Sequence, residues 1–196
     1  MTLSEIPQFI RESYEIHEWR HASAVLSKDF PHEWADLMNV LLNFRLKKSS
    51  IISGGGRKSP VAQAIDDEFY ALGWEEKTFR TEITIDGVSR SSPTHAVDYY
   101  KNHVAIETEW NNKNPFYDRD LNNFRMLFDL HVISVGVIIT RCDELQEIFA
   151  SIGRGTSFGN STTHLSKLLP LIQGGAGGGC PLLIFGISKK LYDENE

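Results

Sequence analysis

Two almost wholly apolar runs constrain the fold of this chain more than any other part of it. Residues 131–140 read HVISVGVIIT and residues 181–187 read PLLIFGI. Runs that are rich in branched aliphatic residues and lack polar alternation are typical of strands buried on both faces of a sheet. The two segments therefore predict strands at the centre of a sheet that is covered on both sides.

Weaker patterns surround these two runs. Alternating apolar residues predict partly buried strands. These strands cover about residues 79–85, 95–100 and 104–110. The strand at residues 79–85, predicted to be half-buried, is followed by a hairpin-type turn at Asp86-Gly87 and a polar connection over residues 89–94. Apolar residues at helical spacing predict helices over residues 3–26, 30–44, 61–72, 115–130, 143–152 and 165–171. Together these elements favour an α/β fold in which helices flank one mixed β-sheet.

Length and composition limit the class of protein. A chain of 196 residues suits one domain, residues 1–196, whose N-terminal helices occupy residues 1–46. The net charge of -6 argues against a non-specific nucleic-acid binder, although a specific nuclease with its basic residues in one cleft is compatible with it. Cys142 and Cys180 offer neither a disulfide framework nor metal-ligand spacing. With no secretory signal or long apolar run, we expect a soluble, cytoplasmic protein without membrane contact.

Three carboxylates stand close together in residues 95–110, which read HAVDYYKNHVAIETEW. In an extended strand, Glu107 and Glu109 project from one face and Thr108 from the other. Asp98 lies nine residues before Glu107, on the preceding strand. Like charges this close resist ionisation unless a cation lies among them, and Mg²⁺ held by carboxylates is the usual solution. The stretch therefore predicts a metal-dependent phosphodiesterase site.

The same stretch resembles the active-site motif of the PD-(D/E)XK nuclease superfamily, with two departures. Ala96-Val97 precede Asp98 where the family has a proline, and Glu109 replaces the family's lysine. Four blocks, in the same order, look like parts of type II restriction endonucleases of the BglII and BstYI group, while the Glu109 triplet is similar to that of BamHI. The blocks are FPHEWADLMNVLL, SPVAQAIDDEFYALGW, VDYYKNHVAIETEWNN and CPLLIFGI.

The resemblance implies a restriction endonuclease that hydrolyses double-stranded DNA at a short palindromic site and leaves 5′-phosphate ends. It also implies a target with a GATC core. Asp98, Glu107 and the carbonyl of Thr108 would bind one or two Mg²⁺ ions, while Glu109 would hold or deprotonate the attacking water. Glu68 is the expected fourth acidic group, ahead of Asp67. A solvated acidic helix face is the alternative interpretation of Glu68.

The resemblance places DNA contacts in loops, where side chains with paired donors read bases in the major groove. The candidate segments are residues 53–60 and 153–163; a flexible surface connector is the alternative for the first. The candidate residues are Arg57, Lys58, Asn111, Asn112, Lys113, Arg119, Arg154, Ser157 and Asn160. A palindromic target implies a homodimer, with contacts expected from the helix at residues 115–130. A cognate DNA methyltransferase is implied in the same cell, without binding to this chain.

Two other functions stay open on the sequence alone. One is a structure-specific repair or junction nuclease of the same fold, and the other is a non-catalytic DNA-binding protein whose acidic residues are structural. A metal-dependent hydrolase of small phosphate esters is disfavoured because the seven histidines are scattered along the chain.

Overall fold

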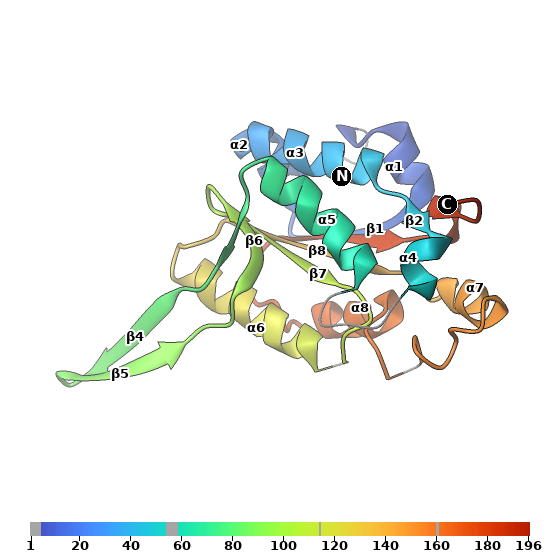
Figure 1. Cartoon of the computed structure of the whole chain (residues 1–196). Coiled ribbons are helices and arrows are strands. Elements are labelled where there is room, and N and C mark those ends of the chain that lie inside the picture. Colours follow the sequence, from blue (N-terminus) through green and yellow to red (C-terminus); the bar gives the residue numbers. More distant parts are fainter. Residues whose placement is uncertain (1–4, 54–58, 114, 160) are drawn as a thin grey trace.

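A six-stranded mixed sheet forms the centre of the computed structural model, which describes residues 5–53, 59–113, 115–159 and 161–196. The strand order is β1-β9-β8-β7-β6-β3, and Figure 1 shows helices on both faces of the sheet. The strands are β1 (Tyr14–Trp19), β3 (Glu75–Lys77), β6 (Val97–Lys101), β7 (Val104–Glu109), β8 (Val135–Arg141) and β9 (Leu182–Ile187). The predicted single-domain α/β fold with a mixed sheet is confirmed.

The two apolar runs form the neighbouring parallel strands β8 and β9, in which every residue is buried. Strand β7 is also parallel to β8, while β6 and β1 join antiparallel on either side. Strand β8 begins at Val135 and not at residue 131, because His131 has a left-handed φ of 57° in the turn that leaves the preceding helix.

The sheet separates two hydrophobic cores, one on each of its faces, and helices cover both. The first face is covered by α1 (Gln8–Ser13), α2 (Ala22–Asp29), α3 (Pro31–Asn43) and α5 (Pro60–Ala71). The second face is covered by α6 (Phe116–Asp129) and α8 (Leu165–Gln173). Smaller elements are α4 (Lys48–Ile52), α7 (Leu145–Ser151), the 3₁₀ helix η2 (Lys189–Leu191), and the paired short strands β2 (Leu46–Lys47) and β10 (Tyr192–Asp193). Among the described residues, no helix combines the length and apolar character that crossing a membrane requires.

The prediction of one helix over residues 3–26 is wrong. Strand β1 separates α1 from α2 and pairs antiparallel with β9. Tyr14 is buried at the start of β1, where its ring packs edge-on against Phe185 and its hydroxyl donates to the carbonyl of Leu41 at 2.9 Å. Pairing with β9 decides the local structure here, so the N-terminal segment is only partly helical. By contrast, the helix predicted over residues 30–44 is confirmed as α3, with Pro31 in its first turn.

The strand predicted at residues 79–85 exists but is not half-buried. Strands β4 (Arg80–Ile85) and β5 (Val88–Pro93) form a separate antiparallel hairpin, called the arm below, which projects from the body in Figure 1. The predicted turn is confirmed, with φ of 51° at Asp86 and 78° at Gly87. The polar connection predicted for residues 89–94 is wrong, because most of it forms β5. The alternation of apolar and polar residues along β4 indicates that one face of the strand is apolar, but it does not indicate whether anything covers that face.

Candidate active site

Asp98 and Glu107 are brought together by the pairing of β6 with β7. The register sets Tyr99 opposite Ile106, so that Asp98 falls opposite Glu107 where the ladder ends. The backbone N–H of Asp98 donates to Glu107 Oε2 at 3.3 Å. The backbone N–H of Thr108 donates to Asp98 Oδ2 at 2.9 Å. Each of the two carboxylates is therefore held by the backbone of the opposite strand.

The carboxyl group of Glu107 is in an unfavourable environment for a charge. Its side chain is only 1% exposed, and no group among the described residues hydrogen-bonds to its Oε1. Burial raises the pKa of Glu107 well above its ordinary value, and the negative charges of Asp98 and Asp120 raise it further. A buried carboxylate oxygen without a donor is costly, so this atom is suited to accept a cation.

Glu109 lies two residues further along the same face and has its own set of neighbours. Asn112 Nδ2 donates to its Oε2 at 2.9 Å, and a guanidinium nitrogen of Arg119 lies 3.7 Å from its Oε1. Burial raises the pKa of Glu109, and the charge of Asp120 together with a hydrogen bond between the two carboxyl groups raises it further. This environment favours the protonated form of the Glu109 carboxyl.

Asp120 is a site residue that the sequence analysis missed. It is fully buried on α6 and accepts two hydrogen bonds on Oδ1 from the guanidinium of Arg119, at 2.9 and 3.0 Å. A signal for it was present in the sequence, since residues 117, 120, 121 and 124 share one helix face and all except Asp120 are apolar. A single acidic residue on an apolar helix face indicates a polar partner across the interface.

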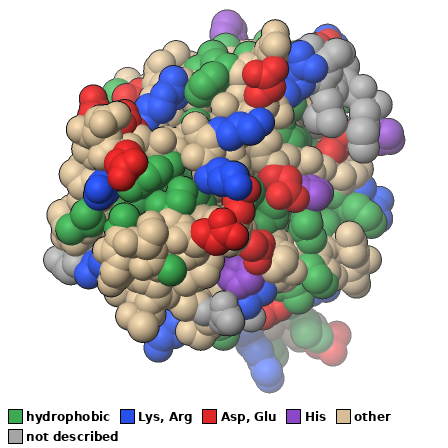
Figure 2. All heavy atoms as spheres, turned by 90° about the vertical axis from the view of Figure 1, so that its right-hand side faces the viewer, with side chains coloured by type: hydrophobic (Ala, Val, Ile, Leu, Met, Phe, Trp, Pro, Cys, Tyr) green, Lys and Arg blue, Asp and Glu red, His purple; other side chains and the backbone are tan. Residues whose placement is uncertain are grey.

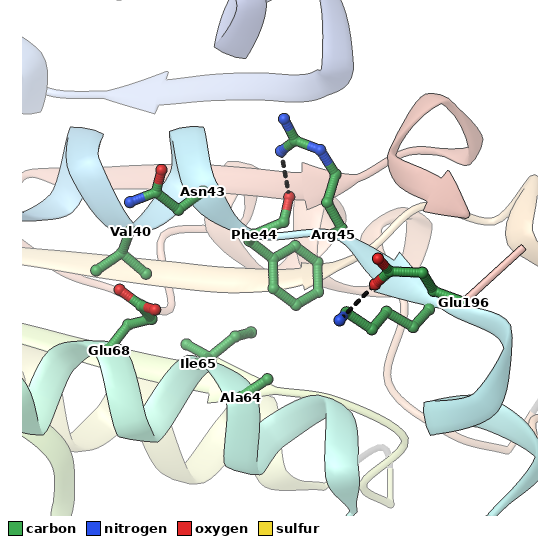
Figure 3. Close-up of a pocket in the computed structure, with 9 residues that line it drawn as sticks. Val40, Asn43, Phe44, Arg45, Ala64, Ile65, Glu68 and Glu196 are labelled. Carbon is green, nitrogen blue, oxygen red and sulfur yellow. Dashed lines mark hydrogen bonds and ion pairs between the residues drawn. The ribbon is translucent and has the colours of Figure 1, made fainter.

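The expected fourth acidic group, Glu68, is not brought to the other carboxylates. Glu68 is exposed and lines a pocket of about 320 Å³ between α5 and α3, and Figure 3 shows it pointing toward Val40. Helix α5 packs on the face of the sheet opposite to Glu107 and Glu109. Asp67, the second choice, is also exposed and accepts a hydrogen bond from Gln63. The expectation that Glu68 belongs to the site is therefore corrected.

Asp66 is the acidic residue of α5 that does contact the catalytic strands. Its side chain is 3% exposed, and its Oδ1 accepts a hydrogen bond from the hydroxyl of Tyr99 at 2.5 Å. Tyr99 directly follows Asp98 on β6 and stacks on Phe69 at a centroid distance of 4.4 Å. Asp66 thus fixes the strand that carries Asp98 from the opposite side of the sheet.

Two of the segments expected to contact DNA lie side by side next to Glu109. Asn112 and Thr163 exchange hydrogen bonds of 3.1 and 2.8 Å, and Lys113 pairs with Thr162 in an isolated bridge. Arg141, which is 1% exposed, anchors the second segment by donating to the carbonyl of Phe158 and to Thr162 Oγ1. Segments that are about fifty residues apart in the chain therefore form one edge of the site.

The other residues expected to contact DNA have mixed positions. Asn111 has a left-handed φ of 58° and turns the chain away from β7. Arg119 lies at the carboxylates, whereas Arg154 and the exposed Ser157 lie in the later loop. Arg57, Lys58 and Asn160 lie outside the described residues. In Figure 2, acidic and basic side chains are interspersed on the face that bears α4 and α7.

The oxygen atoms of Asp98 and Glu107 are the candidate ligands for a divalent cation. Within residues 5–53, 59–113, 115–159 and 161–196, no three Asp, Glu, His or Cys side chains are already grouped around one point. The chemistry of the donors nevertheless fits a hard cation, because Asp98 and Glu107 are adjacent oxygen ligands and Glu107 Oε1 is buried without a donor.

Comparison with known proteins agrees with this geometry. A search of curated proteins gave no match. The family model described as restriction endonuclease BglII/BglIII matches residues 14–187, which include β1, both carboxylate strands and β9. This chain therefore belongs to the BglII/BglIII family of restriction endonucleases, which are type II site-specific deoxyribonucleases.

Proposed function

We propose that this chain cuts both strands of duplex DNA at a short palindromic site, with Mg²⁺ as its divalent ion, and leaves 5′-phosphate ends. Enzymes of the family act on double-stranded DNA and generally use a divalent metal. The observation that carries the proposal is the buried Glu107, which faces Asp98 and has an oxygen without a hydrogen-bond donor. A GATC core in the target and a cognate methyltransferase in the cell are part of the proposal.

Asp98 and Glu107 would hold the ion, together with the backbone carbonyl of Thr108. The bound ion would supply positive charge against the scissile phosphate and lower the pKa of water. The two carboxylates differ in their support, because Asp98 accepts a backbone hydrogen bond on Oδ2, whereas Glu107 Oε1 accepts none among the described groups. Glu107 is therefore the ligand that gains most from the ion.

Glu109 would orient the attacking water and take its proton. The water oxygen forms a bond to phosphorus, the bond from phosphorus to the 3′ oxygen breaks, and the 3′ oxygen takes a proton from solvent. Glu109 accepts a proton only when it is ionised, and the nearby Asn112 amide and Arg119 guanidinium favour that form. Burial and the charge of Asp120 oppose ionisation of Glu109. Positive charge must therefore enter the site before Glu109 can act as a base.

The two loop segments joined through Asn112 and Thr163 would place polar side chains in the DNA groove. Asn111, Asn112 and Lys113 leave the end of the catalytic strand, and the segment with Arg154 and Ser157 is tied to them through Thr163. Side chains fixed close to the carboxylates couple base recognition to the position of the scissile phosphate. Arg57, Lys58 and Asn160 belong to the same proposal on the basis of the sequence alone.

The test is a plasmid digest with Mg²⁺ followed by run-off sequencing of the products. Discrete fragments with one repeated end sequence are expected, and a smear or intact supercoiled plasmid would contradict sequence-specific cutting. Glu107→Ala should not cut, yet should bind a duplex containing the site as well as the parent or more tightly, because a buried negative charge facing phosphate is removed. Unchanged cleavage by Glu107→Ala would overturn the assignment of the site.

A further inference from the structure

The loop that follows α7 is fastened to the chain just beyond Glu109. The ring of Phe158 packs edge-on against that of Trp110, at a centroid distance of 5.9 Å. The backbone N–H of Asn112 donates to Thr163 Oγ1 at 3.1 Å, and the backbone N–H of Thr163 donates to the carbonyl of Asn112 at 2.8 Å. The loop therefore holds the end of the catalytic strand at two points, one apolar and one polar.

The polar point leads directly to the carboxyl group of Glu109. Thr163 is fully buried, and its hydroxyl oxygen is the acceptor for the backbone N–H of Asn112. A backbone N–H that loses its acceptor away from water is costly, so this hydroxyl fixes the backbone of Asn112. From that position the side-chain amide of Asn112 donates to Glu109 Oε2 at 2.9 Å. Two hydrogen bonds in sequence thus connect Thr163 with Glu109.

Arg141 holds the loop from the sheet side. Its buried guanidinium donates through Nη2 to the carbonyl of Phe158 at 3.1 Å and to Thr162 Oγ1 at 2.9 Å, and it lies 5.4 Å from the ring centre of Phe149. These three partners are uncharged, so burying the guanidinium costs free energy that they offset only in part. A planar guanidinium does, however, hold its donors in fixed directions. Arg141 therefore sets the position from which the loop reaches Asn112.

Packing alone would not require a hydroxyl at position 163. The contact of Phe158 with Trp110, together with the stacking of Phe158 on Phe149 at 4.2 Å, already closes the loop onto the body of the protein. Valine has nearly the same shape as threonine and would fill the same buried space. The hydroxyl of Thr163 adds only the hydrogen bond that leads to Glu109, so it is this bond that needs an explanation.

We propose that Thr163 is a positioning residue for Glu109, which it holds in place through Asn112. The inference rests on the proposed function, because that function gives Glu109 its role toward the attacking water. The same loop carries Ser157, which is expected to contact DNA, so a shift of the loop on DNA would reach Glu109 through these contacts. A misplacement of about 1 Å at a reacting group can cost about a hundredfold in rate. Thr163 thus acts on the rate of cleavage and not on the affinity for DNA.

The first test compares cleavage with binding in Thr163→Val. The single-turnover rate of cutting a duplex that contains the site, with Mg²⁺ and saturating protein, should fall about tenfold to a hundredfold. The dissociation constant for the same duplex, measured without a divalent ion, should stay unchanged. Thr163→Ser restores the hydroxyl and should recover most of the rate. Ser23→Ala, which removes a buried hydroxyl bonded to Glu18 on the other side of the sheet, is the control and should cut like the parent.

A double-mutant cycle tests the route through Asn112. Asn112→Ala, at a partly exposed position, should also lower the single-turnover rate, because Glu109 loses its amide donor. Adding Thr163→Val to Asn112→Ala should then lower the rate little further, since the route to Glu109 is already broken. Rate losses that multiply in the double variant would show that the two residues act independently, which contradicts the inference.

A spectroscopic readout separates this inference from the proposed function. The side-chain amide N–H resonances of Asn112, assigned by their loss in Asn112→Ala and recorded without DNA or metal, should move in Thr163→Val and return in Thr163→Ser. Resonances that do not move, or a Thr163→Val protein that cuts at the parent rate, would overturn the positioning role even if the parent cuts at one sequence. A parent that cuts no DNA while these resonances respond would contradict the cleavage proposal and support the positioning of Glu109.

Discussion

Strands β7 and β4 break the same rule in opposite directions. Strand β7 carries Glu107 and Glu109 at 1% exposure each, whereas β4 carries Ile83 at 54% and Ile85 at 64% exposure. Charged residues are normally solvated and large aliphatic residues are normally buried. Each strand therefore has side chains whose preferred surroundings are missing from the isolated chain.

The two strands differ in what surrounds them. Strand β7 has a paired strand on each side, and α6 packs over its carboxylates, so these groups have no access to water as a substitute. Strand β4 pairs only with β5 and faces solvent. Burying unneutralised carboxylates costs several kcal/mol, while exposing isoleucines costs little beyond the burial that they forgo. The comparison indicates that the first strand requires a cation, whereas the second strand leaves an apolar face in water.

The largest expected effect comes from the charged strand. Glu107→Ala should lower the rate of DNA cleavage at least about a thousandfold, equivalent to roughly 4 kcal/mol, because a ligand of the ion is lost. Rates of plasmid nicking in Mg²⁺ measure the change. Glu12→Ala, at an exposed position of α1, is the control and should cut normally. A Glu107→Ala protein within tenfold of the parent would show that the buried carboxylates have a structural role.

The sequence predicted the centre of the fold and the paired carboxylates for physical reasons. Strands buried on both faces require apolar residues at every position, so β8 and β9 could be predicted from the sequence alone. The period of two in a strand places Glu107 and Glu109 on one face, and the short turn between β6 and β7 brings Asp98 beside them.

Other features depended on contacts between distant parts of the chain. The apolar residues of β1 have helical spacing, but the segment forms a strand because it pairs with β9, beginning with Tyr14 opposite Ile187. Asp66 and Glu68 differ by two positions, which is about 200° around a helix, so they lie on nearly opposite faces of α5, and choosing between them requires knowing which face packs on the sheet. Asp120 was recognisable as a polar residue on an apolar face, but its partner Glu109 was not.

The next largest effect tests the cation directly. A saturating concentration of Mg²⁺, about a hundred times the dissociation constant, should stabilise the parent by about 2.7 kcal/mol and raise its melting temperature by roughly 5–10 °C. Glu107→Gln should lose most of that shift because its amide is a poor ligand. Thermal melting with and without Mg²⁺ measures this change, and Na⁺ at equal ionic strength controls for screening. An equal shift in both proteins would place the ion elsewhere.

A smaller effect follows from the raised pKa of Glu109 in the metal-free protein. The folded chain holds a proton that the unfolded chain releases, so this carboxyl contributes stability below its ordinary pKa and loses that contribution as the pH rises toward the raised pKa. Glu109→Gln does not titrate. Relative to the parent, it should therefore gain roughly 1–3 kcal/mol between pH 5 and pH 8. Urea unfolding in EDTA at both pH values measures the gain, with Glu12→Gln as the control; a constant difference would contradict the burial of a protonated Glu109.

The smallest effect is expected at the arm, and it separates the two strands most clearly. At concentrations where the chain is monomeric, Ile85→Thr should change the free energy of unfolding by less than about 0.5 kcal/mol, because its side chain already faces water. The same substitution at Ile138, which is fully buried in β8, should cost roughly 2–4 kcal/mol through lost packing and a buried hydroxyl. Urea unfolding of both variants gives the comparison. A cost at Ile85 close to that at Ile138 would mean that the arm folds back onto its own chain.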